Sequence, residues 1–382
     1  MTESPELCAP QSKVIRLDHG QGQHLSGFPL VSVILVNYNG LRFAEPCLQS
    51  VLDTDYPNFE VVVVDNGSTD GSYEVMRRSY GFDPRVKLIP NYRNLGYAQA
   101  NNVGYRNSVG EVIVFLNIDT EVDPRWLAEL VRALLSSKSV GGAQSKLMSL
   151  ADREFIQSIG HCVDRLGFVY PRVFYQSGSD DAQELFYAEG ASMGFKRSVI
   201  ERVSLDGNPF DPDYFFYYED NDLSWRVRLN GHSIIFVPSS IVYHLGGGCV
   251  PSTFRYRATF SFTKNKISTL IKNYSLGNLL CIVPPVLFLE FVRSVTLLPR
   301  HPLDALARIR ALVWTALNLR GIWRKRVFVQ NRIRVIQDSQ IVRCMVRVDL
   351  IMARRLETGY SFPAKYWQKN RRCEPSSIDQ EG

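Results

Sequence analysis

The chain reads VSVILV at residues 31–36 and EVVVVD at residues 60–65, and these two stretches decide the fold. Each is a short, nearly continuous apolar run, as expected for a strand that is buried on both faces of a parallel sheet. Two further strand patterns, Val86–Ile89 and Glu111–Leu116, follow, and helical stretches separate the strands. Strands that alternate with helices at this spacing predict βαβ units and a twisted parallel sheet of the α/β class.

The second half of the chain has a different pattern. From about Gly141 short strand patterns predict a mixed sheet that closes the site from the other side, and from Tyr256 onward the chain is mostly helical. Elsewhere we expect helices at Leu41–Leu52, Gly96–Tyr105 and Glu219–Leu229 and late strands at Ser233–Val237 and Ile241–His244.

The composition is that of a globular protein with an uneven distribution of charge. Of the 382 residues, 45% are hydrophobic and 21% are charged, which argues against a largely disordered chain. Residues 299–372 hold 17 Lys and Arg against 4 Asp and Glu, whereas the rest of the chain holds 27 against 34. We therefore expect the C-terminal part to contact an anionic surface, with a solvated helical face as the alternative.

The cysteines and the N-terminus indicate a reducing compartment. The seven cysteines are odd in number and include no C-x-x-C pair, so we expect neither a zinc site nor a disulfide framework. Residues 1–28 are polar and lack the basic start and apolar core of a secretory signal. The best candidate membrane span, Leu276–Leu298, is continuously apolar only over Leu279–Leu289, well short of the roughly 20 residues that cross a bilayer. We interpret it as interfacial or buried.

Polar residues follow several of the expected strands, at the edge where an α/β sheet binds its ligands. Asp65 ends the second strand, where a carboxylate can accept hydrogen bonds from a nucleobase or a ribose. The alternative is a capped turn with Ser68 or Thr69 at a helix N-terminus. Asn117 and Asp119 follow the fourth strand and can turn two oxygens toward a divalent cation, although Asn and Asp are also common where a strand simply ends.

An aromatic run leads into an acidic cluster. Residues 214–218 are all aromatic and precede Glu219 and Asp220 at an expected helix start. The helix dipole favours acids there, but five consecutive aromatic side chains cannot all face one core. Some of them are expected to line a cleft, where a partly desolvated carboxylate can act as a general base. His244, followed by Gly246–Gly248, is either structural or a third metal ligand or phosphate contact.

Together these segments resemble family 2 glycosyltransferases with the GT-A fold, and among them the bacterial rhamnosyltransferase-like branch. The resemblance covers Val31 to Asn273 and is specific through the joint order and spacing of the motifs. The matching segments are SVILVNYNG (32–40), FEVVVVDNGSTDGS (59–72), NLGYAQANNVG (94–104), GEVIVFLNIDT (110–120), FDPDYFFYYEDNDLSWRVRLNG (210–231) and VYHLGGG (242–248).

The resemblance implies a role for each candidate residue. Asp220 matches the catalytic base, and Asp119 and His244 match ligands of a divalent cation, Mn²⁺ or Mg²⁺. Asn117 stands where the family's DxD motif has its first acid, so the cation would be held by Asp119, His244 and the phosphates of the donor. The implied donor-binding residues are Tyr38, Asn39, Asp65, Asn117 and Asp119, with Tyr38 placed to stack on the base, and the acceptor-side residues are Glu219, Tyr217 and Tyr218.

The implied activity is inverting transfer of one sugar from a nucleotide-diphosphate sugar, with dTDP-rhamnose as the commonest donor of the branch. The acceptor would be a hydroxyl of a glycan or lipid-linked oligosaccharide in cell-surface polysaccharide synthesis. The Q-x-x-R-W motif of processive synthases is absent from the sequence. We expect a cytoplasmic, peripheral enzyme on the inner face of the cell membrane, with an anionic membrane surface and no nucleic acid as partner.

The expected organisation has four parts. They are a flexible N-terminal segment 1–28, a GT-A glycosyltransferase domain 29–273, a helical, basic, membrane-interface extension 274–372, and a polar tail 373–382.

Two other interpretations of the sequence compete with this one. A non-catalytic nucleotide-sugar or glycan-binding protein with the same fold would fit the neutral Asn117, whereas Asp220 and His244 favour an enzyme. A Rossmann-type oxidoreductase would need G-x-G-x-x-G after the first strand, but residues 37–40 read NYNG.

Overall fold

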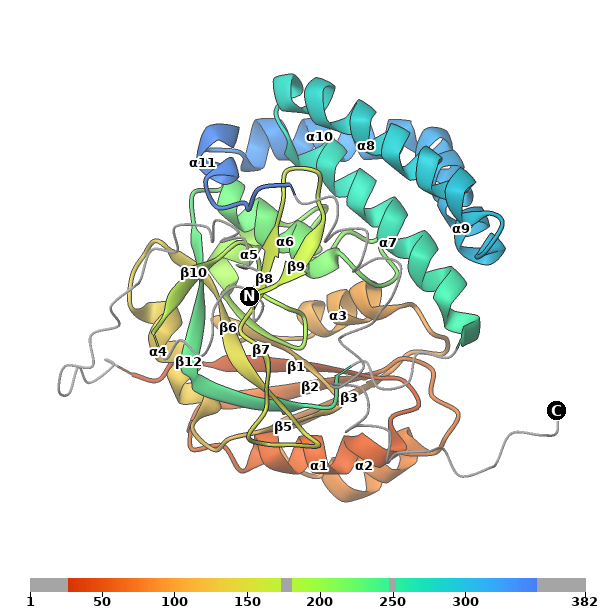
Figure 1. The fold of residues 1–382 in the computed structure, drawn as a ribbon. Helices are drawn as coiled ribbons and strands as arrows, with labels where there is room; N and C mark the ends of the chain where they lie inside the picture. The colour runs from red at the N-terminus through yellow and green to blue at the C-terminus, as the bar shows by residue number, and fades with distance from the viewer. Residues whose placement is uncertain (1–26, 173–180, 247–251, 349–382) are drawn as a thin grey trace, which may run out of the picture.

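The computed structural model describes residues 27–172, 181–246 and 252–348 (Figure 1). It is a mixed α/β structure with helices on both faces of a central sheet, so the fold class expected from the sequence is confirmed. Most of the expected N-terminal segment 1–28 and the whole polar tail 373–382 lie outside the described residues.

Within the described residues, ten strands form one sheet and two more form a separate hairpin. The strands are β1 Val31–Asn37, β2 Phe59–Asp65, β3 Val86–Pro90, β4 Val112–Asn117, β5 Thr120–Val122, β6 Val140–Ser149, β7 Ile156–Ser158, β8 His161–Val163, β9 Val169–Pro171, β10 Gln183–Leu185, β11 Ser192–Lys196 and β12 Ser233–His244. The main order is β10-β12-β6-β11-β4-β1-β2-β3, with β5 beside β12 and β7 beside β6. β1 to β4 pair in parallel, and antiparallel β11 between β4 and β6 makes the sheet mixed.

The helices form layers on the two faces of this sheet (Figure 1). They are α1 Leu41–Leu52, α2 Ser72–Tyr80, α3 Tyr97–Arg106, α4 Trp126–Leu135, α5 Arg197–Val203, α6 Glu219–Leu229, α7 Ser252–Asn273, α8 Leu276–Leu297, α9 Pro302–Leu317, α10 Leu319–Phe328 and α11 Asp338–Val342, with a π-helical turn at Val329–Ile333. α1, α2 and α4 pack on one face, and α3, α5 and α6 on the other. Helices α7 to α10 form a further layer over α5 and α6.

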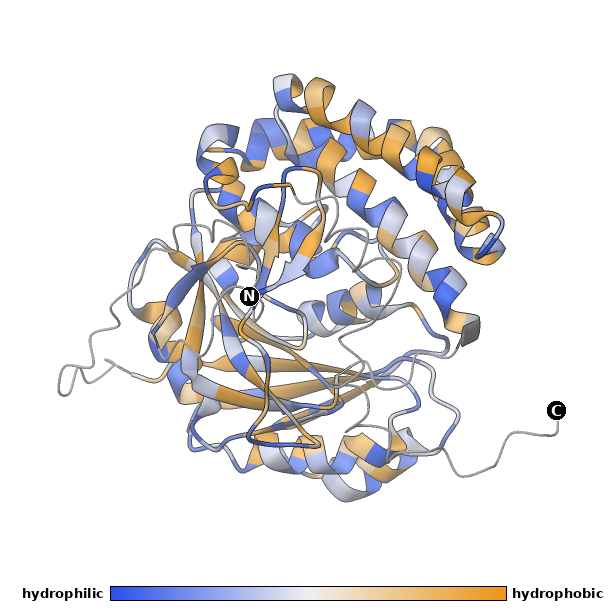
Figure 2. Cartoon of the chain, viewed as in Figure 1, coloured by the Kyte–Doolittle hydropathy of each residue, from blue (hydrophilic) through white to orange (hydrophobic). Residues whose placement is uncertain are grey.

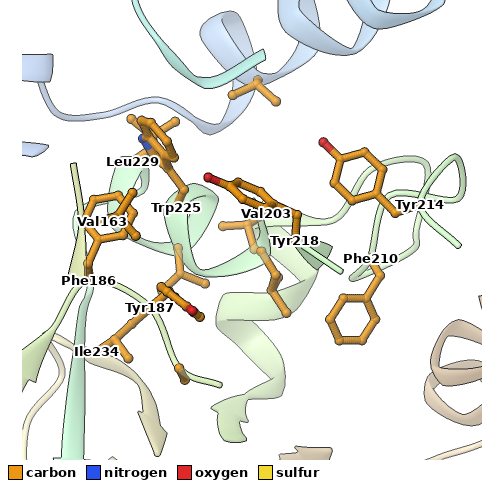
Figure 3. Packing of buried hydrophobic residues seen from close by; sticks show 14 of the residues in the cluster. Val163, Phe186, Tyr187, Val203, Phe210, Tyr214, Tyr218, Trp225, Leu229 and Ile234 are labelled. Carbon is orange, nitrogen blue, oxygen red and sulfur yellow. The ribbon is translucent and has the colours of Figure 1, made fainter. Parts of the chain in front are cut away.

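The apolar run of β1 supplies both faces of the sheet. Val33 and Leu35 belong to the core shared with α1 and α4, whereas Ile34 belongs to the core shared with α3, α6 and α7. Because successive side chains of a strand point to opposite faces, a strand covered on both sides needs apolar residues at every position. Figure 3 shows the second core, where Trp225 of α6 packs edge-on against Phe186 at 5.3 Å between ring centres.

The late strands are one strand. The expected strands Ser233–Val237 and Ile241–His244 are the two parts of β12, and its pairing with β6 is irregular between Val237 and Ile241. Pro238 lies in this interval and has no N–H to donate, which explains the local break in the ladder.

A buried network of charges fixes α6 to the C-terminal helices. Lys272 of α7 pairs with Asp211 and with Asp222 of α6, the latter at 3.0 Å. Arg226 donates from Nε to Oδ2 of Asp222 at 3.0 Å, and Lys325 of α10 pairs with Asp211. Removing one partner of such a pair costs about 3–5 kcal/mol, because the other charge is left buried without compensation. The helices after residue 273 are therefore packed as one body with the sheet domain.

Helix α8 contains the segment that was the best candidate for a membrane span. Leu276–Leu297 is a single helix of 22 residues that continues through Pro284 and Pro285 and past Glu290. By length and composition alone it is the one helix in the described part of the chain that could cross a membrane, and 33% of its apolar window is buried inside the protein. The helix is longer than its apolar run because neither the prolines nor Glu290 ends it, and the interpretation of the segment as interfacial or buried stays a prediction.

Candidate active site

Three polar residues lie at the carboxyl ends of neighbouring parallel strands. They are Asn37 of β1, Asp65 of β2 and Asn117 of β4; Asn37 is opposite Asp65, and Val36 is opposite Asn117. Since neighbouring strands lie about 4.8 Å apart, these side chains share one edge of the sheet, as the sequence predicted.

Asp65 is buried, and both of its carboxylate oxygens accept hydrogen bonds from the protein. Asn37 donates from Nδ2 to Oδ1 at 2.8 Å, and the backbone N–H of Ser68 donates to Oδ2 at 3.1 Å. Asn37 Nδ2 also donates to Oγ of Ser72 at 2.8 Å. The carboxylate is thereby fixed in orientation, and its remaining lone pairs are the acceptors that it can offer a ligand.

The loops that follow β1 and β2 are joined to each other. The N–H of Asn39 donates to Oγ of Ser68 at 2.9 Å, and the N–H of Thr69 donates to Oδ1 of Asn39 at 2.8 Å. Asn39 has a φ of 50°, which Asn adopts more readily than most residues, and at Gly40 a Cβ would lie 2.4 Å from a side-chain oxygen of β1. Tyr38 is 49% exposed at this edge, where its ring is accessible to a planar ligand.

Asp119 and His244 meet although they are far apart in the sequence. Oδ1 of Asp119 lies 3.5 Å from Nε2 of His244, and Nδ2 of Asn117 lies 3.4 Å from the same nitrogen. The contact exists because β12 pairs with β5, which places His244 opposite Thr120. Burial alone would raise the pKa of Asp119, but His244 lowers it; the carboxylate in turn raises the pKa of His244 against the effect of burial.

Gln157 of β7 orients His244, and no motif in the sequence indicated this role. Its Oε1 lies 2.9 Å from Nδ1 of His244. Because this oxygen can only accept, Nδ1 carries the hydrogen, and Nε2 is the nitrogen turned toward Asp119. Partners of this kind orient the histidines that bind metals in proteins.

The donor set fits a divalent cation only as a partial site. Asp119 offers a carboxylate, His244 offers Nε2, and Asn117 can offer its amide oxygen. In residues 27–172, 181–246 and 252–348, no three His, Cys, Asp or Glu side chains gather so that they could hold a metal ion. Cations such as Mg²⁺ complete their coordination with oxygens of substrate phosphates, so the set suits a cation that arrives with a diphosphate.

Asp220 lies in the first turn of α6. Its Oδ2 accepts a hydrogen bond from the N–H of Gly190 at 3.1 Å, and its Oδ1 accepts one from the N–H of Asn221 at 2.7 Å. Desolvation raises the pKa of Asp220 to about 6, against these two hydrogen bonds, which lower it. A carboxylate with this pKa is matched to accept a proton near neutral pH.

Glu219 precedes Asp220 and is 7% exposed. Its Oε2 has no hydrogen-bond partner in the described part of the chain. Burial and then the charge of Asp220 raise the pKa of Glu219 well above its usual range. Burial and the neighbouring charge therefore both favour the protonated form of this carboxyl.

The residues that lead into α6 are held in an unusual conformation. Tyr217 and Tyr218 have φ of 65° and 74°, in the left-handed region that costs a non-glycine residue about 1–2 kcal/mol. Asn265 of α7 donates from Nδ2 to the carbonyls of Phe216 at 3.1 Å and Tyr217 at 2.7 Å. Tyr218 is buried in the core (Figure 3) and donates its hydroxyl to the carbonyl of Gly167. That position suits a residue that fixes the loop rather than one that contacts an acceptor, whereas Tyr217 is half-buried.

Glu189 and His161 are candidate site residues that the sequence analysis missed. Nδ1 of His161 lies 3.3 Å from Oε2 of Glu189, and Ser158 donates to the same oxygen at 2.7 Å. Burial would raise the pKa of Glu189, but His161 lowers it to about 2. Glu189 directly precedes Gly190, which donates to Asp220. The one available signal was a Glu-Gly turn ahead of the apolar strand β11.

The turn at residues 190–191 connects the two halves of the site. The N–H of Gly190 donates to Asp220, and the carbonyl of Ala191 accepts a hydrogen bond from the N–H of Asn117 at 3.1 Å. The hydroxyl of Tyr97 donates to the carbonyl of Gly190 at 2.8 Å. Burial raises the pKa of Tyr97, and the charges of Asp220 and Asp119 both add to this effect. Both carboxylates are therefore within electrostatic range of one tyrosine.

A surface pocket also opens beside Asp119. It lies between α1 and β5 and is lined by Arg42 and Phe43 on one side and by Glu121 and Leu245 on the other. Asp220 does not line it, so this pocket covers only the Asp119 side of the site.

Part of the chain matches a known protein family. Residues 32–203 match the family model described as Glycosyl transferase family 2. An uncharacterized glycosyltransferase of Haemophilus influenzae is 29% identical over 260 residues, which is 64% of this chain and 77% of that protein. Residues 32–203 are therefore similar to the family 2 glycosyltransferases.

The sheet and the helices on its two faces have the GT-A fold. The crystal structure of GalNAc-T7 with UDP, GalNAc and Mn²⁺ superposes with a TM-score of 0.52 at 19% identity, over 64% of this chain and 48% of that one. Uncharacterized protein y4gI of Sinorhizobium fredii is 30% identical over 231 residues, or 58% of this chain. The chain spans only 25% of the length of that relative.

The family match covers only part of the candidate site. It includes Asp65, Asn117 and Asp119 but ends at residue 203, before Asp220 and His244. The two later residues join the matched part through the hydrogen bond from Gly190 to Asp220 and the contact between Asp119 and His244.

Proposed function

We propose that this glycosyltransferase moves one sugar at a time from a nucleotide-diphosphate sugar to an acceptor hydroxyl, with inversion at the anomeric carbon. The observation that carries the proposal is the turn at residues 190–191, which holds Asp220 on one side and Asn117, next to the Asp119–His244 pair, on the other. A non-catalytic sugar-binding protein is less well supported, because it would not need a carboxylate with a pKa of about 6 at this place.

The donor side of the site is the edge formed by β1, β2 and β4. We assign the base and ribose of the donor to Tyr38, Asn39 and Asp65, since Tyr38 is exposed and the carboxylate of Asp65 is fixed in orientation. Asn117 and Asp119 would then face the diphosphate.

A divalent cation, Mn²⁺ or Mg²⁺, would be held by Asp119 and His244, with Asn117 beside them. Such a cation stabilises the negative charge that develops on a departing nucleoside diphosphate. Gln157 keeps Nε2 of His244 turned toward Asp119 before any ligand arrives.

Asp220 would act as the general base. Its carboxylate accepts the proton of the acceptor hydroxyl while the acceptor oxygen bonds to the anomeric carbon from the face opposite the diphosphate. The anomeric C–O bond to the diphosphate breaks, and the nucleoside diphosphate leaves with the bonding electron pair. Holding donor and acceptor in line can remove roughly 7–11 kcal/mol of the barrier, so the binding residues matter as much as the base.

The acceptor would be a hydroxyl of a glycan or of a lipid-linked oligosaccharide in cell-surface polysaccharide synthesis, with Glu219 and Tyr217 beside it. The first donor to test is dTDP-rhamnose, from the rhamnosyltransferase-like branch that the motifs resemble. A lipid-linked acceptor would be used at the cytoplasmic face of the cell membrane.

The experiment is a panel of dTDP-, UDP- and GDP-sugars assayed for released nucleoside diphosphate, with membrane extract as the source of acceptor. We expect release with one class of donor that requires the extract, and loss of this release in Asp220→Asn. Binding of a nucleotide-sugar without any release would favour the non-catalytic alternative.

The cation is tested by titrating the donor with and without Mn²⁺. We expect Mn²⁺ to tighten nucleotide-sugar binding in the wild type. In the presence of Mn²⁺, Asp119→Asn should bind the nucleotide-sugar about tenfold or more weakly than the wild type does. Asp53→Asn, at an acid on the end of α1, is the control. Equal affinities with and without Mn²⁺ in the wild type would contradict the assignment.

A further inference from the structure

Exposed apolar side chains are concentrated on the C-terminal helices. Of the 27 large apolar side chains exposed in the described residues, 17 lie within residues 276–328. We call the exposed Leu, Ile, Val, Phe and Trp side chains of this segment the apolar face; Leu280, Phe288 and Phe291 of α8 and Leu303, Leu306 and Leu317 of α9 represent it. Figure 2 shows the apolar colouring along α8 and α9. Soluble monomers rarely leave a patch of this extent without a partner.

The charges that accompany the apolar face are all positive. Residues 276–348 contain three acidic residues, Glu290, Asp304 and Asp338, and all three are buried. Glu290 pairs with Lys266 and Arg308, Asp304 with Arg255, and Asp338 with Arg334. The exposed charged side chains of residues 276–348 are arginines, namely Arg300, Arg310, Arg320, Arg324, Arg332, Arg343 and Arg347.

This combination selects one kind of partner. A second copy of the chain would bring cations against cations, with no exposed carboxylate in residues 276–348 to pair with them. A nucleic acid would engage the arginines but would leave the leucines and phenylalanines in water. An anionic bilayer matches both features, because its hydrocarbon takes apolar side chains while its headgroups pair with arginines.

Helix α8 keeps its packing against α7 and α9 when the apolar face contacts lipid. Glu290 of α8 is fully buried and pairs with Lys266 of α7 and Arg308 of α9. If α8 left this packing to cross a bilayer, Glu290 would enter hydrocarbon without its partners, which is costly. Only the outward side chains of α8 and α9 can therefore enter the lipid.

We propose that the apolar face inserts into one leaflet of an anionic lipid bilayer, so that α8 to α10 lie in the membrane interface without spanning it. This deepens the proposed function, on which it rests for its purpose: it would bring the candidate active site to a lipid-linked acceptor. The binding itself needs neither donor nor acceptor.

The test measures sedimentation of the full chain with vesicles of phosphatidylcholine, with and without phosphatidylglycerol. We expect binding to the anionic vesicles, and the double variant Phe288→Glu/Leu303→Glu to partition about tenfold more weakly or worse. The matched control is Phe82→Glu/Val109→Glu, which changes a Phe and an aliphatic residue that are 94% and 71% exposed far from this face in the sequence. Equal sedimentation of the two double variants would overturn the proposal.

A second variant tests the cations. Arg320→Gln/Arg324→Gln is expected to lose about tenfold in affinity for anionic vesicles, and the loss should shrink as salt is added. Thermal unfolding at the wild-type temperature shows that a variant is folded. The proposal would be overturned if the wild-type chain did not sediment with anionic vesicles and instead bound nucleic acid. The same holds if it did not sediment with them and instead self-associated through the apolar face. Nucleoside diphosphate release by a chain that does not sediment would leave the proposed function intact and remove only this inference.

Discussion

Asp65 and Asp220 are two aspartates of one site with opposite surroundings. Asp65 is buried between donors, because Asn37 and the N–H of Ser68 each hold one of its oxygens. Asp220 lies among acids, with Glu219 beside it in the chain and Glu189 before the glycine that donates to it. The same side chain is a fixed hydrogen-bond acceptor in the first setting, and in the second it has the raised pKa that suits the base proposed above, so its neighbours decide its chemistry.

The largest expected effect comes from removing the proton acceptor. We expect Asp220→Asn to lower kcat by about 10²–10⁴, the usual contribution of a general base, with donor affinity unchanged. Single-turnover assays and donor titration measure the two quantities separately. Turnover close to that of the wild type would mean that Asp220 is not the group that accepts the proton of the acceptor.

Substitution of Asp65 should act on binding instead. Asp65→Asn keeps the shape of the side chain, but its amide N–H₂ would face Asn37 or the N–H of Ser68, which are themselves hydrogen-bond donors. We therefore expect the KM for the nucleotide-sugar to rise about tenfold with little change in kcat. Steady-state kinetics over a donor series gives both constants. A fall in kcat at constant KM would contradict a binding role, and thermal unfolding controls for loss of fold.

The pH dependence should follow Asp220. With a pKa of about 6, the base is ionised above that pH and protonated below it, so activity should be level above pH 6 and fall about tenfold per pH unit below it. Asp65→Asn should keep this midpoint. A profile that is flat from pH 5 to pH 7 in the wild type would exclude Asp220 as the group that must be ionised.

The smallest effect is expected at Glu219. Burial and the charge of Asp220 both raise the pKa of Glu219 and so favour its protonated form, which Gln resembles in charge and shape. We therefore expect Glu219→Gln to change kcat by no more than a few-fold. The midpoint of the pH profile should stay near 6. Loss of activity as large as that of Asp220→Asn would reverse the assignment of the two carboxyls.

The donor side of the site was predictable from the sequence because it lies on regular elements. Continuous apolar runs predicted β1, β2 and β4, and the carboxyl ends of parallel strands must meet at one edge. Asn37, Asp65 and Asn117 are therefore neighbours in the structure, as expected.

The other side was less predictable because it is built from very short strands. Gln157 and His161 lie on the three-residue strands β7 and β8, and Glu189 lies in a turn, so no periodicity marks them. Tyr218 illustrates a different limit. An aromatic run cannot tell which of its rings points into the core, and the structure places this one there.

The pairing of Lys272 with both Asp211 and Asp222, and of Asp211 with Lys325, has a consequence for exchanging parts between relatives. A hybrid that takes its last helices from another family member must also take the matching charge at position 211. Otherwise one charged side chain stays buried without its partner, and α6, the helix that carries Asp220, loses its ion pairs with α7. A swap made between Asp222 and Lys272 separates these partners, so it would fail in folding before it could report on specificity.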